Sequence, residues 1–116
     1  MAFPQDQLDE LLELSPGLRE FEEGGFQYFF LPGLQLPDGC EPRQVDALLC
    51  PMQRDGYSSR LYFAVQVRPM GRANLAALNW NGSVRILERN WHAHSWRTPA
   101  GLRLAQMVAI HLKALR

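Results

Sequence analysis

The sequence predicts an α+β domain in which several strands lie between a helix at each end. Residues 5–14 repeat leucines at helical spacing, with acidic side chains on the opposite side. Residues 18–67 contain four short apolar and aromatic segments that Gly- and Pro-containing turns separate. Residues 98–115 carry a second apolar stripe at helical spacing. Strands grouped together with helices at the ends are typical of an α+β layer architecture.

The N-terminal half is expected to form a helix and then a four-stranded antiparallel meander. The helix over residues 5–14 ends at Ser15-Pro16-Gly17. A hairpin is predicted over residues 18–31, because Gly24-Gly25 supplies the positive φ angles that a tight turn requires. Residues 32–42, rich in Pro and Gly, are expected to be a connection. The third and fourth strands are predicted over residues 45–52 and 61–67.

The C-terminal half is expected to contain an irregular segment and a closing helix. Residues 79–83 have turn chemistry, and residues 84–87 are expected to be a short irregular or extended piece. Thr98 is the predicted N-cap of the last helix, with Pro99 at its first position. The apolar stripe of that helix consists of Leu102, Ala105, Val108, Ala109, Leu112 and Leu115.

Length and charge narrow the possible classes of protein. A chain of 116 residues is expected to form one domain over residues 1–116. Twelve basic residues balance twelve acidic residues, so the chain lacks the positive charge typical of a nucleic-acid binder. Basic residues dominate after Arg85 and acidic residues dominate over residues 5–23. The two ends are therefore expected to attract each other, or the basic end to face an acidic partner.

Nothing in the sequence indicates a membrane span, a secretory signal or a disulfide framework. No run of 18 apolar residues occurs, and residues 1–20 lack a basic segment followed by an apolar one. Two cysteines ten positions apart do not make a disulfide framework or a zinc ligand set. The expectation is a cytoplasmic protein with reduced thiols and no membrane contact.

Residues 79–102 resemble the active-site stretch of ubiquitin-conjugating enzymes. In that family Asn-Gly-x-Ile-Cys-Leu is followed by Trp-Ser-Pro and a helix. Here residues 81–84 match the approach, Arg85 falls at the cysteine, residues 86–87 follow, and residues 96–99 resemble the entry to the helix. The resemblance implies a ubiquitin-conjugating-like (UBC-like) fold, with residues 79–87 as its irregular active-site-like segment.

The resemblance is closest to bacterial UBC-like proteins of prokaryotic family E. Phe-Leu-Pro-Gly at residues 30–33 and Trp-x-x-His at residues 91–94 are similar to the pattern of that group. The group is associated with ubiquitin-like proteins, activating enzymes and metalloprotease-type deconjugases. The resemblance therefore implies a ubiquitin-like protein, its activating enzyme, or both, as partners.

The sequence departs from the family at the residues that do the chemistry. The His-Pro-Asn tripeptide of the family is missing, and residues 78–80 are the nearest stretch. A guanidinium stays protonated and cannot act as a nucleophile, whereas thioester transfer requires a thiolate, so Arg85 excludes the usual mechanism. The leading hypothesis is a divergent or noncatalytic member that binds a ubiquitin-like protein or its activating enzyme.

Two other hypotheses stay open. The chain could be an active transferase with a displaced nucleophile, Cys50 or Cys40, assisted by His94 as acid or base. The ordinary alternative for Cys50 is a small buried hydrophobe, and for His94 a packed loop residue. The chain could also be a generic α+β protein-interaction module with no link to ubiquitin.

Candidate partner-binding residues gather near the matched stretch: Trp80, Asn81, Arg85, Trp91 and His92. Tryptophans are either core residues or exposed anchors for a protein partner, and Trp80, beside an Asn-Gly turn, is expected to be the more exposed. His92 and His94 would share one face of an extended segment, but no third metal ligand is evident. No metal or cofactor is therefore expected, and the oligomeric state is left open.

Overall fold

The computed structural model describes residues 3–53, 56–69, 81–93 and 98–115. The order of elements is α1 (Gln5–Leu14), β1 (Arg19–Glu23), β2 (Phe26–Gln35), β3 (Cys40–Glu41), β4 (Gln44–Cys50), β5 (Arg60–Phe63), β6 (Arg68–Pro69), β7 (Asn81–Ile86), β8 (Arg89–Ala93) and α2 (Leu104–Lys113). Six strands form one antiparallel sheet in the order β1-β2-β4-β5-β8-β7, and β3 pairs with β6 separately. The predicted α+β class is confirmed.

The first helix and the first hairpin agree with the sequence predictions. Helix α1 covers the predicted residues, and the Ser15 hydroxyl after it donates to the carbonyl oxygen of Pro32 at 2.7 Å. Gly24 and Gly25 have φ angles of 59° and 84° and join β1 to β2. The strands β1, β2, β4 and β5 pair in the order of the predicted four-stranded meander, but the predicted number of strands is wrong, because β8 and β7 extend the same sheet beyond β5.

The predicted connection over residues 32–42 is wrong for its first part, because β2 continues to Gln35. The register of β2 against β4 shifts between Leu31 and Leu34, and Gly33 there has a φ angle of 64°. This bulge accommodates Pro32, which cannot donate to a regular ladder.

The predicted turn is wrong at residues 81–83, whereas the extended alternative for residues 84–87 is confirmed as far as Ile86, since residues 81–86 form β7 and pair with β8. Val84 and Ile86 alternate with Arg85, a pattern of period two that is typical of a strand. The connecting residues Leu87 and Glu88 have φ angles of 52° and 62°, a conformation that usually selects Gly or Asn. The prediction failed because this turn lacks the residues that identify a tight hairpin.

The last helix begins at Leu104, not near Thr98, so the predicted cap is wrong. Gly101, with a φ angle of 80°, separates Thr98 from the helix. The Gln106 side chain accepts a hydrogen bond from the Arg103 backbone N–H at 2.8 Å, and the Gln7 side chain of α1 accepts one from the Leu104 backbone N–H at 3.1 Å. Part of the cap is therefore supplied by a residue far away in the sequence.

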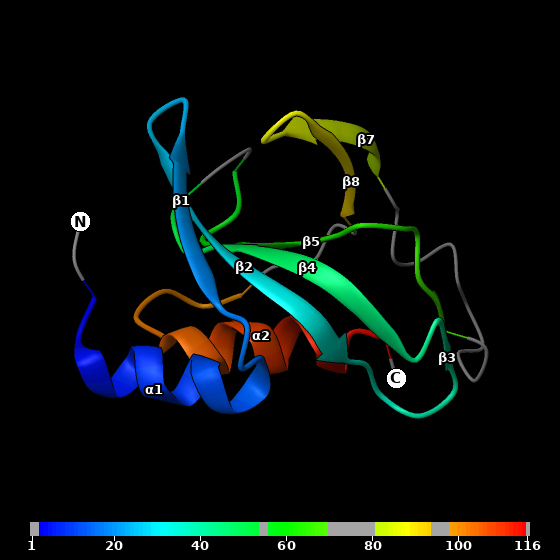
Figure 1. Ribbon diagram of the computed structural model, residues 1–116, viewed down its shortest axis with the longest axis horizontal. Helices are drawn as coiled ribbons and strands as arrows, with labels where there is room; N and C mark the ends of the chain where they lie inside the picture. The colour runs from blue at the N-terminus through cyan, green and yellow to red at the C-terminus, as the bar shows by residue number, and fades with distance from the viewer. Residues whose placement is uncertain (1–2, 54–55, 70–80, 94–97, 116) are drawn as a thin grey trace.

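Both faces of the sheet are buried, one under the two helices and the other under the curl of the sheet itself. Figure 1 shows α1 and α2 on one side of the sheet, while β7 and β8 curl back over the other side. Alternate residues of each central strand enter the two cores, so Phe29 lies toward the helices and Tyr28 lies toward the curl. The helix-side core includes Leu11, Leu31, Leu49, Leu61, Phe63, Leu104 and Val108. The concave-side core consists of Tyr28, Leu48, Cys50, Tyr62, Ile86, Trp91 and Ala93.

The expected attraction between the two ends of the chain is present in one place. The Arg103 guanidinium at the start of α2 lies 2.6 Å from the Asp6 carboxylate and 3.0 Å from the Glu10 carboxylate of α1. The hydrogen bond from Arg103 lowers the pKa of Asp6. Because these groups are partly exposed, the pairs contribute little free energy of folding and mainly orient the helices.

Candidate functional site

The β7–β8 hairpin carries four of the five predicted partner-binding residues, Asn81, Arg85, Trp91 and His92. Val84 pairs with Trp91 and Ile86 pairs with Arg89, and Trp91 and Ile86 belong to the concave-side core. Side chains of paired residues lie on the same side of a sheet. Arg89 therefore lies on the concave face, whereas Arg85, which pairs with Asn90, lies on the outer face.

The outer face of the hairpin presents two of the predicted partner-binding residues. Arg85 is exposed, and His92, two residues beyond Asn90 on β8, is partly exposed on the same outer face. Asn81 begins β7, where its backbone pairs with Ala93. Trp80 lies outside the described residues. Arg85 and His92 are thus brought together on one surface, as a binding site requires.

Trp91 is a core residue and not an exposed anchor. Its side chain is 2% exposed, and its indole N–H donates to the carbonyl oxygen of Ile86 at 3.0 Å. A buried indole with its donor satisfied stabilises the hairpin. The prediction that Trp91 contacts a partner from an exposed surface is therefore corrected.

The two candidate nucleophiles are buried on opposite faces of the sheet. Cys50 is fully buried in the concave-side core, and its Sγ lies 3.9 Å from the carbonyl oxygen of Met52. Cys40 is 3% exposed in the helix-side core, with Sγ 3.9 Å from the carbonyl oxygen of Leu115. Burial raises the pKa of Cys40, which disfavours the thiolate. His94, the proposed acid or base, lies outside the described residues.

A hollow opens on the concave face between the tips of two hairpins. We define the hairpin cleft by the residues that line it: Phe21, Phe30, Leu87, Arg89 and Trp91. Its volume is about 220 Å³. Phe30 makes edge-to-face contacts with both Phe21 and Trp91, with ring centroids 6.4 and 6.3 Å apart. The cleft is therefore an aromatic surface with one cationic side chain.

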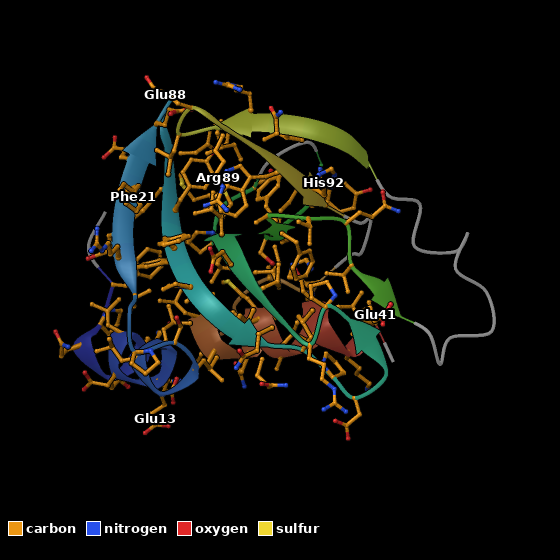
Figure 2. All side chains as sticks on the ribbon, turned by 45° about the vertical axis from the view of Figure 1, so that its right-hand side comes forward. Glu13, Phe21, Glu41, Glu88, Arg89 and His92 are labelled. Carbon is orange, nitrogen blue, oxygen red and sulfur yellow. The ribbon has the colours of Figure 1, made fainter. Side chains whose placement is uncertain are left out.

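Arg89 is held at the opening of the hairpin cleft by a ring and a carboxylate. Its guanidinium lies 4.9 Å from the ring centroid of Trp91, and 3.7 Å separates it from the Asp46 carboxylate. Asp46 also accepts a hydrogen bond from the backbone N–H of Gly33 at 3.0 Å, at the bulge of β2. Figure 2 shows Arg89 between β8 and the β1–β2 hairpin, with Glu88 at the end of the adjoining turn.

A hydrogen bond joins the two hairpin tips beside the cleft. The Leu87 backbone N–H donates to the Glu23 carboxylate at 2.9 Å. Leu87 and Glu88 adopt positive φ angles that are unfavourable for residues with a Cβ. The contact with Glu23 and the packing of Leu87 in the concave-side core hold this strained turn. The alternation over residues 84–86 and 91–93 is the sequence signal that could have located the β7–β8 hairpin.

A buried hydroxyl–imidazole cluster lies on the helix side, and the sequence analysis did not find it. The Ser59 Oγ is 3.0 Å from His111 Nε2 and 2.9 Å from Thr98 Oγ1. A serine beside a histidine is the arrangement of many hydrolases. Here all three side chains are at most 8% exposed, so no substrate reaches them, and the cluster links Ser59, the residue before β5, to α2. His111 gave no signal because it occupies the buried stripe of a helix.

The described residues hold no group of three or more His, Cys, Asp and Glu side chains suited to a metal ion. No helix in this part of the chain has the length and apolar character needed to cross a membrane. Comparison of the chain with protein-family models, with curated proteins and with solved structures finds no match.

Proposed function

We propose that this chain is a noncatalytic UBC-like protein that binds a ubiquitin-like protein or its activating enzyme in the bacterial cytoplasm. The observation that carries the proposal is that neither the matched position nor either cysteine offers an exposed thiol. Arg85 takes the position that matches the family's cysteine, and both thiols of the chain are buried. The start of the chain, in which α1 is followed by the meander of β1, β2, β4 and β5, supports the same family, whereas β8 and β7 extend this sheet before α2.

The chemistry favours binding over transfer. Transfer between thioesters needs a thiolate that meets a second protein at the surface. Cys50 has no exposed surface, and Cys40 is nearly as buried, with a pKa raised by burial. A displaced-cysteine transferase would require a different conformation in which one core opens.

The outer face of the β7–β8 hairpin is the proposed binding surface. Arg85 and His92 provide hydrogen-bond donors there, and Arg85 supplies a positive charge for an acidic partner. Asn81 and Trp80 belong to the same proposal, because they precede Arg85 in the chain. Trp91 contributes by fixing the hairpin from its inner side.

A charging reaction tests the proposal. The protein is mixed with ATP, a bacterial ubiquitin-like protein and the activating enzyme of that protein, and products are separated without reducing agent. We expect no thioester on this chain, but capture of one of the two proteins in a pull-down. Arg85→Glu is expected to weaken the capture at least tenfold, whereas Arg19→Glu on β1, at the other edge of the sheet, is expected to leave it unchanged. A thioester that disappears in Cys50→Ala or Cys40→Ala would overturn the noncatalytic proposal.

One observation favours a generic α+β interaction module instead. The stretch that matches the family's irregular active-site segment is a strand here, paired with β8 through a two-residue turn, with one register shift between Asn81 and Val84. If neither an activating enzyme nor a ubiquitin-like protein is captured, the generic module becomes the better description of the chain.

A further inference from the structure

We propose that the hairpin cleft binds the carboxyl-terminal residue of a peptide chain. The apolar side chain of that residue occupies the aromatic cleft, and its terminal carboxylate contacts Arg89. This inference concerns the concave face of the sheet and does not depend on the proposed link to ubiquitin-like proteins, which uses the outer face.

The walls of the cleft select one large apolar side chain. Four of its five lining residues have apolar side chains: Phe21, Phe30, Leu87 and Trp91. Trp91 is 2% exposed and its indole N–H already donates to a backbone carbonyl, so this ring contributes little surface to the cleft, and that surface is apolar. The volume of about 220 Å³ is below the range of about 300–1,000 Å³ that is usual for cofactor and drug-sized ligands. The cleft therefore suits a side chain better than a cofactor.

Arg89 supplies the second point of recognition. Its side chain is 49% exposed, and its ion pair with Asp46 measures 3.7 Å, which is longer than a hydrogen bond. Within the described part of the chain, its guanidinium makes no side-chain hydrogen bond, while the Trp91 ring at 4.9 Å fixes its position. Its N–H donors are thus available, and a guanidinium fork matches a carboxylate with two parallel hydrogen bonds.

The acidic groups around the cleft decide which kind of anion fits. Asp46 faces Arg89 directly, Glu23 lies at the neighbouring hairpin tip, and Glu88 precedes Arg89 in the turn. These carboxylates repel a polyanion such as a nucleic-acid backbone or an acidic tract. A single carboxylate attached to an apolar group satisfies both the cation and the aromatic walls with the least repulsion. The last residue of a peptide chain has this chemistry.

The strained turn makes the cleft rigid before a ligand arrives. Leu87 forms one wall while its φ angle is 52°, and Glu23 accepts the hydrogen bond of its backbone N–H. Backbone strain that neighbouring contacts maintain is concentrated at ligand-binding sites. A cleft that is already formed avoids the entropy that ordering a loop around the ligand would cost.

Binding of short peptides to the full chain, followed by two-dimensional amide NMR, tests the proposal. The probe is acetyl-Ser-Gly-Ser-Gly-Phe with a free carboxylate, compared with the same peptide as a C-terminal amide and with a version that ends in Ala. We expect shifts at Leu87, Arg89 and the Trp91 indole, and an affinity at least tenfold weaker for the amide and for the Ala peptide.

Three variants distinguish this site from nonspecific attraction. Arg89→Gln is expected to bind the acid and the amide equally weakly, while its dispersed spectrum shows that the chain is folded. Arg85→Gln, the same change on the opposite face of the same hairpin, is expected to keep the tenfold preference. Asp46→Asn removes the carboxylate that competes for Arg89 and is expected to tighten binding of the acid about threefold. Equal binding of acid and amide to the unaltered chain, loss of the preference in Arg85→Gln, or no shift at millimolar peptide would each overturn the proposal.

Discussion

The two faces of the sheet are buried in different ways. On the helix side, α1 and α2 cover a continuous apolar core that includes Leu11, Phe29 and Val108. On the concave side no helix among the described elements covers the sheet, and the core is closed by the curl of the sheet and by the hydrogen bond between Glu23 and Leu87. The concave side therefore keeps an open cleft, while the helix side is packed between two layers.

This difference assigns the two faces different roles: the helix side mainly stabilises the fold, and the concave side carries the proposed binding cleft. A core between a sheet and two helices excludes water and contributes most of the hydrophobic free energy of folding. The concave side contains the half-exposed Arg89 and the strained turn, features that stability alone does not require. We expect substitutions on the helix side to change the free energy of unfolding strongly, and substitutions of the partly exposed Phe21 and the exposed Arg89 at the cleft to change it weakly.

The largest expected effect is the loss of an aromatic ring from the helix-side core. Phe29→Ala removes a fully buried side chain and is expected to lower the free energy of unfolding by about 3–5 kcal/mol. Phe21→Ala at the partly exposed cleft is expected to lower it by only about 1 kcal/mol. Urea denaturation followed by circular dichroism measures both. Equal losses would show that the two faces contribute alike.

The buried Ser59 cluster gives the second largest effect. Ser59→Ala removes the partner of both Thr98 Oγ1 and His111 Nε2 in a site without exposed surface, and a cost of about 1–3 kcal/mol is expected. The neighbouring Ser58 is exposed, so Ser58→Ala is expected to stay within about 0.5 kcal/mol of the unaltered chain. The same denaturation experiment applies, and a similar result for both serines would remove the structural role assigned to the cluster.

A substitution in the strained turn is expected to raise the free energy of unfolding, whereas the preceding substitutions lower it. Asn tolerates a positive φ angle better than Glu, so Glu88→Asn should raise the free energy of unfolding by about 0.5–1 kcal/mol. Gln27→Asn, in the regular part of β2, is a control that is not expected to stabilise. A Glu88→Asn variant that is less stable than the unaltered chain would mean that the Glu88 side chain makes a stabilising contact.

The smallest expected effect is a pH dependence of the contact between the helices. Arg103 lowers the pKa of Asp6 in the folded chain, so the folded state binds this proton less tightly than the unfolded state. The stabilisation is present above the unfolded pKa and is lost as the pH falls through the folded pKa. Asp6→Asn should therefore lower Tm slightly at about pH 6, and the difference should shrink as the pH falls through the lowered pKa of Asp6.

A second acidic residue of α1 provides the control for this titration. Asp9 is exposed and accepts a hydrogen bond from Gln5, not from Arg103. Asp9→Asn makes the same change of charge on the same helix and is expected to show a smaller dependence of Tm on pH. If the two variants behave alike over this range, the effect is one of net charge and not of the Arg103 contact.

Local patterns explain which elements could be predicted from the sequence. Helix α1 follows from leucines at helical spacing, and the β1–β2 turn follows from Gly24-Gly25. The β7–β8 hairpin was missed because Leu87 and Glu88 adopt a turn that their own preferences disfavour. The contact with Glu23, 64 positions earlier in the chain, holds that turn.

The candidate sites could be predicted less well than the fold. Arg85 was singled out through a family resemblance, and its exposure on β7 agrees with a surface role. Arg89 had no comparable signal, although the same hairpin places it beside Phe21 and Phe30 of the first hairpin. A cleft built from three strands has no pattern along the chain, because its residues are neighbours only in space.

The sequence by itself determined the α+β class, the first helix, the first hairpin and the absence of a usable nucleophile at Arg85. These depend on periodicity over a few turns, on glycine conformation and on the chemistry of one side chain. Only the tertiary structure decided that Cys50 and Cys40 are buried on opposite faces, that Gln7 caps α2, and that Arg85 and Arg89 lie on opposite faces of one hairpin. Burial, long-range caps and strand register arise from contacts between distant segments, which no local pattern encodes.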